Sequence, residues 1–233
     1  MLDNIYGDFM SSFMLKFIGI ITMLCDHTGD AFLGRFSFLN LIGRIAFPIF
    51  AFQLVQGYIH TKDIKKHIIK LFIFACISQV PFMLFLSTFS NNYYLNIFFT
   101  LLLGTVAILA FDKINNKFLS FLIVLFMCLI AEVIHVDYGA FGVALVFVFY
   151  LFKDNKLLTS ISFFLLTFIE YLPNALKYSK VFTIYLQFIL WTFFAIVPIL
   201  LYNGKQGPKV KYLFYIFYPL HLTILWALCT FVF

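Results

Sequence analysis

The sequence predicts an all-α protein, a polytopic bundle of about nine transmembrane helices. The first observation is its composition, because 64% of the residues are hydrophobic, only 11% are charged and the mean hydropathy is +1.02. Soluble domains are about 45–50% apolar and about 25% charged. The second observation is that the apolar residues occur in stretches of about 20, which is the length of a helix that crosses a bilayer.

Brief connections separate these apolar stretches, and neither a clear repeat nor a low-complexity segment interrupts them. We expect helices near residues 13–32, 40–59, 67–87, 94–111, 117–135, 139–152, 157–173, 180–202 and 210–232. The first stretch is long and carries Asp26 and His27, so we interpret it as a retained helix and not as a cleavable signal peptide. Residues 1–233 are then expected to form a single integral membrane domain.

The lysines and arginines predict the orientation. The connections after the second, fourth, sixth and eighth helices hold Lys62, Lys65, Lys66, Lys70, Lys113, Lys117, Lys153, Lys156, Lys205, Lys209 and Lys211, and the alternate connections hold Arg35, Arg44, Lys177 and Lys180. Because positively charged connections stay in the cytoplasm, we expect the N-terminus there and the C-terminus outside a bacterial plasma membrane. The net charge of +6 is explained by this pattern, and the lysines are not clustered with aromatics as nucleic-acid binding would require.

The first helix carries Asp26, His27 and Asp30 near its outer end. At about 1.5 Å of rise per residue, His27 lies roughly 21 Å from the inner end, within the bilayer. Ionisable groups at such a depth are costly and are generally used or paired. Asp26 and Asp30 share a helix face, and a carboxylate beside an imidazole is the arrangement of a general base. The alternative is a structural polar cluster that fixes this helix against its neighbours.

The second helix brings an arginine to a similar depth. Arg35 and Arg44 are the only arginines of the chain, and both fall near the outer end of the first two helices. Arginine grips anions with a planar fork that lysine lacks, so Arg44 is a candidate substrate-binding residue. We also expect Arg44 to pair with Asp26 or Asp30. Pro48, four residues later, should bend this helix because it lacks a backbone N–H.

The last helix places Tyr215, Tyr218 and His221 in steps of three, hence along one stripe. His221 lies roughly 16 Å from the inner end, within a helical turn of the depth of His27. Pro219 interrupts the hydrogen-bond ladder of this helix. His221 is therefore interpreted either as part of a site at the depth of His27 or as a satisfied core histidine.

Other polar residues in the apolar stretches have simpler interpretations. Ser78, Gln79 and Thr100 are expected to form hydrogen bonds between helices. Glu132 and His135 are expected at the solvated outer end of the fifth helix, although they could also belong to a proton relay. The four cysteines lie singly in apolar stretches, so neither a metal site nor a disulfide framework is predicted.

Six segments together resemble the TraX family of integral membrane proteins. They are LKFIGIITMLCDHTG, IGRIAFPIFAFQLVQGYIHTKD, LFIFACISQVPF, NIFFTLLLG, DYGAFGVALV and FYIFYPLHL, which occur in this order between residues 15 and 222. The family takes its name from a conjugation protein that acetylates the N-terminus of pilin subunits. A more distant resemblance is to acyltransferase-3-type membrane acyltransferases, in which a histidine at the outer end of the first helix and a final helix rich in aromatic residues correspond to His27 and His221.

This resemblance implies an acetyltransferase that uses acetyl-CoA as the acyl donor, with a peptide, pilin or glycan as the acceptor. Its site residues would be His27, Asp26 and His221 for catalysis, and Arg44, Asp30 and Tyr218 for the substrate. His60 and Lys62, in a cytoplasmic connection, would attract the phosphates of acetyl-CoA. Two alternatives from other classes stay open, a small proton-coupled transporter and a non-enzymatic assembly factor for a surface structure.

Overall fold

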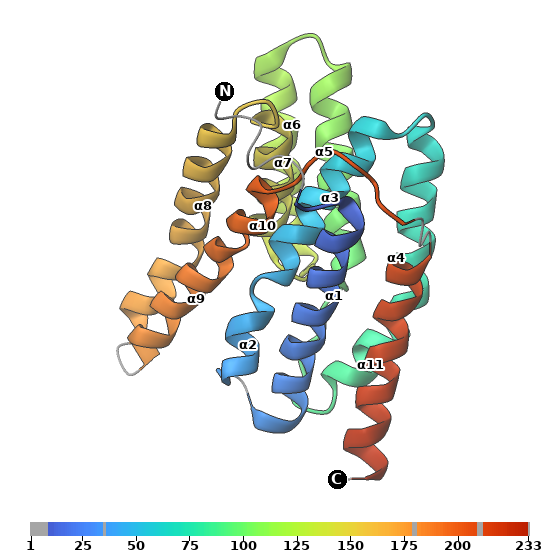
Figure 1. Cartoon of the computed structure of the whole chain (residues 1–233), viewed down its shortest axis with the longest axis vertical. Helices are drawn as coiled ribbons and strands as arrows, with labels where there is room; N and C mark the ends of the chain where they lie inside the picture. Colours follow the sequence, from blue (N-terminus) through green and yellow to red (C-terminus); the bar gives the residue numbers. More distant parts are fainter. Residues whose placement is uncertain (1–8, 35, 179–180, 209–211, 233) are drawn as a thin grey trace. The chain divides into compact units, whose positions relative to one another are not determined.

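The structure is a computed structural model that describes residues 9–34, 36–178, 181–208 and 212–232, and within these ranges it contains helices and no strand (Figure 1). The elements are α1 Ser12–Thr28, the π-helix η1 Gly29–Leu33, α2 Phe38–Gly43, α3 Ala46–His60, α4 Ile64–Leu86, α5 Ile97–Lys113, α6 Lys117–Val133, α7 Gly139–Leu151, α8 Lys156–Lys177, α9 Phe182–Phe194, α10 Ile196–Leu200 and α11 Leu213–Phe231. The all-α prediction is confirmed.

The predicted number of helices is also confirmed for the described residues. The elements α1 and η1 follow one another directly, and α2–α3 and α9–α10 are separated by one or two residues, so each pair forms one helical segment. Nine segments result, and each corresponds to one predicted helix. Of the cations that predicted the orientation, Arg35, Lys180, Lys209 and Lys211 lie outside the described residues.

A break separates α2 from α3 at Arg44 and Ile45. In a continuous helix the carbonyl of Arg44 would accept a hydrogen bond from residue 48, but that residue is Pro48 and has no N–H. The predicted bend therefore occurs one turn before the proline, and it places Arg44 at the C-terminal cap of α2. The side chain of Arg44 thus projects from a helix end instead of a helix interior.

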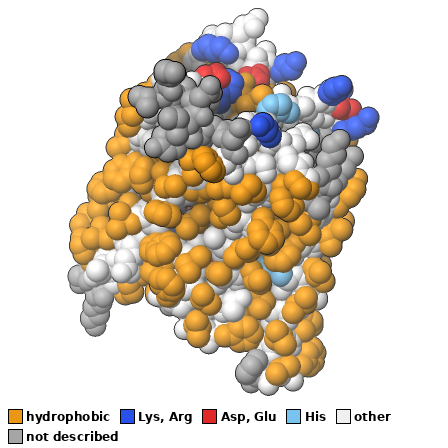
Figure 2. Space-filling view, in the orientation of Figure 1, with side chains coloured by type: hydrophobic (Ala, Val, Ile, Leu, Met, Phe, Trp, Pro, Cys, Tyr) orange, Lys and Arg blue, Asp and Glu red, His pale blue; other side chains and the backbone are white. Residues whose placement is uncertain are grey.

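Five helical segments of the described chain are long and apolar enough to cross a membrane, namely 38–60, α4, α8, 182–200 and α11. On α4 an exposed stripe of Ile69, Ile73, Ile77 and Val80 runs along one face at helical spacing. Hydrophobic side chains likewise cover most of the face seen in Figure 2. Such a surface is far more apolar than soluble monomers expose, which identifies a membrane protein.

The chain divides into two compact units, one of residues 1–53 and 167–233 and the other of residues 54–166, so the division falls within α3 and α8. We describe each unit separately and call them unit 1 and unit 2. The prediction of a single domain over residues 1–233 stays a prediction.

One end of unit 2 is held by polar groups. Asn96 is fully buried at the start of α5, where it donates to the carbonyl of Ala75 and to Oε1 of Gln79 at 2.8 Å each. The hydroxyl of Thr100 donates to the carbonyl of Asp137. The interhelical hydrogen bond predicted for Gln79 is therefore confirmed, whereas Thr100 bonds to the turn between α6 and α7.

Three other polar predictions in unit 2 have different outcomes. The hydroxyl of Ser78 is buried with no hydrogen-bond partner in the described part of the chain, so the prediction for this residue is wrong. Ser78 is fully buried on α4, so its small side chain packs among its neighbours without a polar contact. Glu132 and His135 are exposed as expected, and the Glu132 carboxylate accepts from the backbone N–H of Ala140 at the start of α7.

The other end of unit 2 joins the C-terminal ends of α3, α5 and α7. Tyr58 and Tyr150 both donate their hydroxyl protons to the carboxylate of Asp112, with an O···O distance of 2.7 Å for Tyr58. Eight lysines lie in the connections that follow these three helices, at the end of α5 and in the first turns of α4, α6 and α8, and Lys62 is one of them. Three of the connections predicted to be cytoplasmic therefore lie at the same end of unit 2, as helices that alternate in direction require.

Unit 1 is built around α1, which packs against α2 and α11 (Figure 1). The connection from α10 to α11 crosses the start of α1, where the backbone N–H groups of Ser12 and Phe13 donate to the carbonyls of Lys205 and Gln206. Gln53, the last residue of the first segment of unit 1, accepts a hydrogen bond of 2.6 Å from the Ser12 hydroxyl. The start of α1 is thus fixed by residues distant in the sequence.

Candidate active site

The C-terminal end of α1 is the centre of a buried polar cluster in unit 1. At Gly29 the helix changes to the five-residue π-helix η1, which contains Asp30. Short π-helical turns within α-helices frequently mark functional sites. Asp26 and Asp30 were predicted to share a face, and this is confirmed because Nδ2 of Asn40 contacts a carboxylate oxygen of each, at 3.2 and 2.9 Å.

An ion pair joins α1 to the end of α2. Nη2 of Arg44 lies 2.6 Å from both carboxylate oxygens of Asp26, whose side chain is 10% exposed, compared with 20% for Arg44. The guanidinium also donates from Nε to the carbonyl of Asn40 and stacks over the ring of Phe188, 5.4 Å from its centroid. The predicted pairing of Arg44 with Asp26 is confirmed.

Asn40 is the polar hub between these carboxylates, and sequence reasoning missed it. Its Nδ2 donates to the Asp26 carbonyl as well as to the two carboxylates, and its Oδ1 accepts from the backbone and hydroxyl of Ser37. Ser37 caps α2 reciprocally with Asn40. A Ser-x-x-Asn spacing before an apolar run resembles a capping box, so this signal was available in the sequence.

Gly43 allows the close approach of α1 to α2. A Cβ atom at this position would overlap the Cβ, Cγ and Oδ1 atoms of Asp26. No side chain other than hydrogen leaves space for the carboxylate that Arg44 holds. The ion pair therefore depends on a glycine that carries no chemistry itself.

Gly43→Ala is expected to lower the free energy of unfolding by about 1–3 kcal/mol, because the added methyl must displace Asp26 or separate the helices. The matched control is Gly57→Ala in α3, where the new Cβ would lie 3.5 Å from Cε1 of His67, an ordinary contact. That change should be neutral or stabilise by up to about 1 kcal/mol through helix propensity. Thermal unfolding in detergent micelles compares the two, and equal effects would contradict the close approach.

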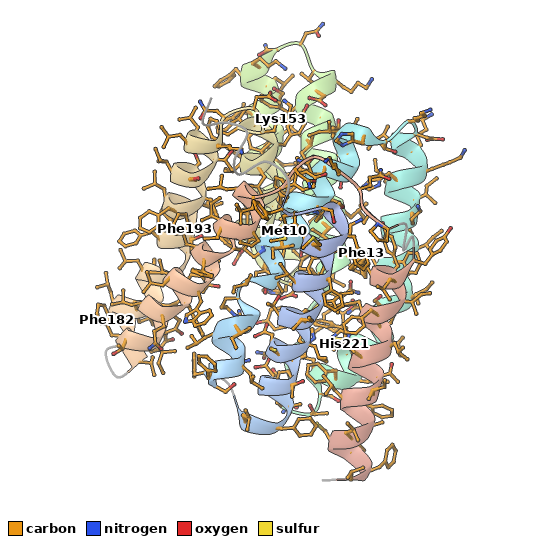
Figure 3. The ribbon with its side chains drawn as sticks, in the orientation of Figure 1. Met10, Phe13, Lys153, Phe182, Phe193 and His221 are labelled. Carbon is orange, nitrogen blue, oxygen red and sulfur yellow. The ribbon has the colours of Figure 1, made fainter. Side chains whose placement is uncertain are left out.

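Two histidines meet beside the ion pair. Nδ1 of His27 on α1 lies 2.7 Å from Nε2 of His221 on α11, and Nδ1 of His221 lies 2.8 Å from the carbonyl of Phe217. Figure 3 shows His221 on the side of α11 that faces α1. The prediction that both histidines lie at one depth is confirmed. The sequence predicted a carboxylate beside the imidazole of His27, whereas the structure places a second imidazole at its Nδ1.

Aromatic rings enclose the two imidazoles. The ring of Phe217 stacks on His221 with centroids 4.6 Å apart, and Tyr218 contacts both histidines edge-on. His221 and Tyr218 are buried, 4% and 3% exposed, whereas His27 is partly exposed. This arrangement can take up and pass on a proton at the imidazole of His27, whose surroundings are held rigid.

Unit 1 therefore contains six of the eight predicted site residues, namely Asp26, His27, Asp30, Arg44, Tyr218 and His221. His60 and Lys62 belong to unit 2, where both are exposed and His60 contacts the carbonyl of Gln56 through Nδ1. Asp63 follows them and caps α4, and the backbone N–H of Lys66 lowers the pKa of its carboxyl. Their role towards acetyl-CoA stays a prediction.

A known protein family matches nearly the whole chain, including the residues of this cluster. The family model described as "TraX protein" matches residues 11–229. The chain belongs to the TraX family. All six clustered residues fall within the matched range of this TraX-family chain. The more distant resemblance to acyltransferase-3-type enzymes stays a prediction.

The chain is also similar to a curated bacterial protein. It is 28% identical over 240 residues to the "Probable fimbrial assembly protein FimC, serogroup H1" of Dichelobacter nodosus, with 92% of this chain and 94% of the relative covered. No solved structure matches the chain. The similarity therefore covers the length of the TraX-family chain.

Proposed function

We propose that this TraX-family protein is an acetyltransferase of a bacterial plasma membrane, crossing it several times with the N-terminus in the cytoplasm. The observation that carries the proposal is the imidazole pair of His27 and His221, held beside the buried ion pair of Asp26 and Arg44. The acyl donor is acetyl-CoA from the cytoplasm. The acceptor is an amine or hydroxyl of an exported peptide, a pilin N-terminus or a glycan.

The chemistry of acetyl transfer matches these side chains. An amine or hydroxyl must lose a proton as it attacks the thioester carbonyl, and an imidazole is the usual side-chain base near neutral pH. Negative charge develops on the thioester oxygen during attack, and positioned cations such as Arg44 favour it. We assign removal of the acceptor proton to His27 and stabilisation of the developing negative charge to Arg44. Tyr218 and Asp30 are assigned to the lining of the acceptor site.

The donor is assigned to the lysine-bearing end of unit 2. Lys62 and His60 are exposed there, and an exposed ammonium attracts phosphates as a point charge. The carboxylate of Asp63 in the same connection opposes this attraction. We therefore expect Lys62 to attract the phosphates together with the other lysines at this end of unit 2, and not alone.

A second function is favoured by the printed name of the relative, a fimbrial assembly protein. In this alternative the protein assists assembly of a surface fibre without transferring a group, and the ion pair of Asp26 and Arg44 serves to join α1 to α2. Both functions are carried out in the membrane on material that is exported to the cell surface. They differ in whether the exported subunit gains an acetyl group.

Transfer of labelled acetyl distinguishes the two functions. Membranes with and without the protein are supplied with acetyl-CoA labelled in its acetyl group, and surface peptides and glycans are then separated and examined by mass spectrometry. We expect label in one surface species only when the protein is present. Equal labelling in both membranes, together with loss of surface fibres in the strain that lacks the protein, would favour the assembly function.

A further inference from the structure

The hydrogen bonds of His221 determine which of its ring nitrogens carries the proton. Its Nδ1 lies 2.8 Å from the carbonyl of Phe217, and a carbonyl oxygen only accepts. Nδ1 of His221 therefore carries hydrogen and donates. A neutral imidazole has one N–H, so Nε2 of His221 has a lone pair and accepts.

This assignment extends to His27 because the two rings are hydrogen-bonded. Nε2 of His221 accepts at a distance of 2.7 Å, so Nδ1 of His27 must be the donor. The neutral imidazole of His27 then has its lone pair at Nε2. The carbonyl of Phe217 thus sets the tautomers of both histidines through two consecutive hydrogen bonds.

The ring geometry supports a directed N–H···N bond between the histidines. Their planes are 14° apart and their centroids 4.9 Å apart, well beyond the 2.7 Å between the two nitrogens. The rings consequently meet end to end, where imidazole N–H bonds and lone pairs point. Phe217 stacks on His221 with an interplanar angle of 11°, which holds the plane of the accepting ring.

Burial separates the roles of the two histidines. His221 is 4% exposed and both of its nitrogens have hydrogen-bond partners within unit 1. His27 is partly exposed. Of the two residues, His27 is therefore the one with exposed surface, whereas His221 is buried.

We infer that His27 is the base of the site and acts through Nε2, and that His221 is a positioning residue that fixes the His27 tautomer. This inference rests on the proposed acetyl transfer. When His27 takes a proton at Nε2, its Nδ1–H already points at the lone pair of His221. The cationic ring is thus stabilised without rearrangement of any hydrogen bond, as the orienting carboxylate does in a serine protease triad.

The step balances with these two histidines and the two substrates. The lone pair of the acceptor nitrogen or oxygen attacks the thioester carbonyl carbon, and Nε2 of His27 removes the acceptor proton. The C–S bond then breaks, the electron pair leaves on sulfur, and Nε2 returns the proton to the thiolate. The products are the acetylated acceptor and the free thiol, and His27 regains its lone pair at Nε2.

Nitrogen NMR of the protein with ¹⁵N-labelled histidine tests the tautomers without any substrate. In detergent micelles, correlation of ring nitrogens with ring protons distinguishes Nδ1–H from Nε2–H imidazoles, and single substitutions assign the five histidines of the chain. We expect Nδ1–H tautomers for both His27 and His221. An Nε2–H tautomer at His27 in the unaltered protein would overturn the inference whether or not the protein transfers acetyl groups.

Two variants of His221 separate positioning from packing. His221→Phe keeps a ring against Phe217 but removes the acceptor, so His27 should change to the Nε2–H tautomer and acetyl transfer should slow by about 100-fold or more. His221→Gln retains an acceptor oxygen near the place of Nε2 and should keep both the Nδ1–H tautomer and most of the rate. Equal tautomers and equal rates in the two variants would show a purely structural role for His221. If no acetyl transfer is found in the unaltered protein, the proposed function fails while the tautomer result stands.

Discussion

Arg44→Leu is expected to lower the free energy of unfolding by about 3–5 kcal/mol, because it leaves the carboxylate of Asp26 buried without its cation. Nη2 of Arg44 lies 2.6 Å from both oxygens of that carboxylate. Asn40 donates to one of these oxygens, but a neutral amide does not compensate a buried charge. Thermal and chemical unfolding in detergent micelles measures the loss.

The exposed ion pair of Lys66 and Asp63 provides the matched control. Its N···O distance is 3.3 Å and its side chains are 84% and 44% exposed. Lys66→Ala should therefore change the unfolding free energy far less than Arg44→Leu does, because water screens an exposed pair. The double variant Asp26→Leu with Arg44→Leu removes both charges and should recover part of the loss of Arg44→Leu. A loss at Arg44 no larger than that at Lys66 would mean that the buried pair does not stabilise unit 1.

The helices could be predicted because bilayer thickness and apolar length are simple constraints on the sequence. Residues 40–59 were predicted as a helix with a proline bend, and the structure contains both the helix and the break that Pro48 requires. The pairing of Arg44 with Asp26 was predictable for a related reason. A buried charge needs a partner, and few opposite charges were available at that depth.

The partners of the histidines could not be predicted from the sequence. His27 and His221 are 194 residues apart, and their contact depends on which faces of α1 and α11 meet. Neighbouring residues on a helix point about 100° apart, so Asp26 contacts Arg44 at the end of α2 whereas His27 contacts His221 on α11. The π-helical turn at Gly29–Leu33 further changes the direction of the residues that follow. Nothing in the pattern of apolar residues indicates this turn.

His27→Ala is expected to slow the proposed acetyl transfer by about 100- to 10,000-fold, the range that a positioned general base contributes. The side chain is partly exposed at the end of α1, and its Nδ1 is anchored at 2.7 Å from His221. Removing it leaves the acceptor to lose its proton to water. The rate of label transfer from acetyl-CoA, with the unfolding temperature determined in parallel, measures the effect.

His135→Asn is the matched control, because His135 is an exposed histidine in the turn before α7 and its φ of 52° is one that asparagine adopts readily. Its rate should equal that of the unaltered protein. Added imidazole should restore part of the rate of His27→Ala, since it can fill the space of the lost ring and accept the proton. A structural role for His27 predicts a lowered unfolding temperature and no rescue. Full activity of a folded His27→Ala variant would instead remove His27 from the chemistry.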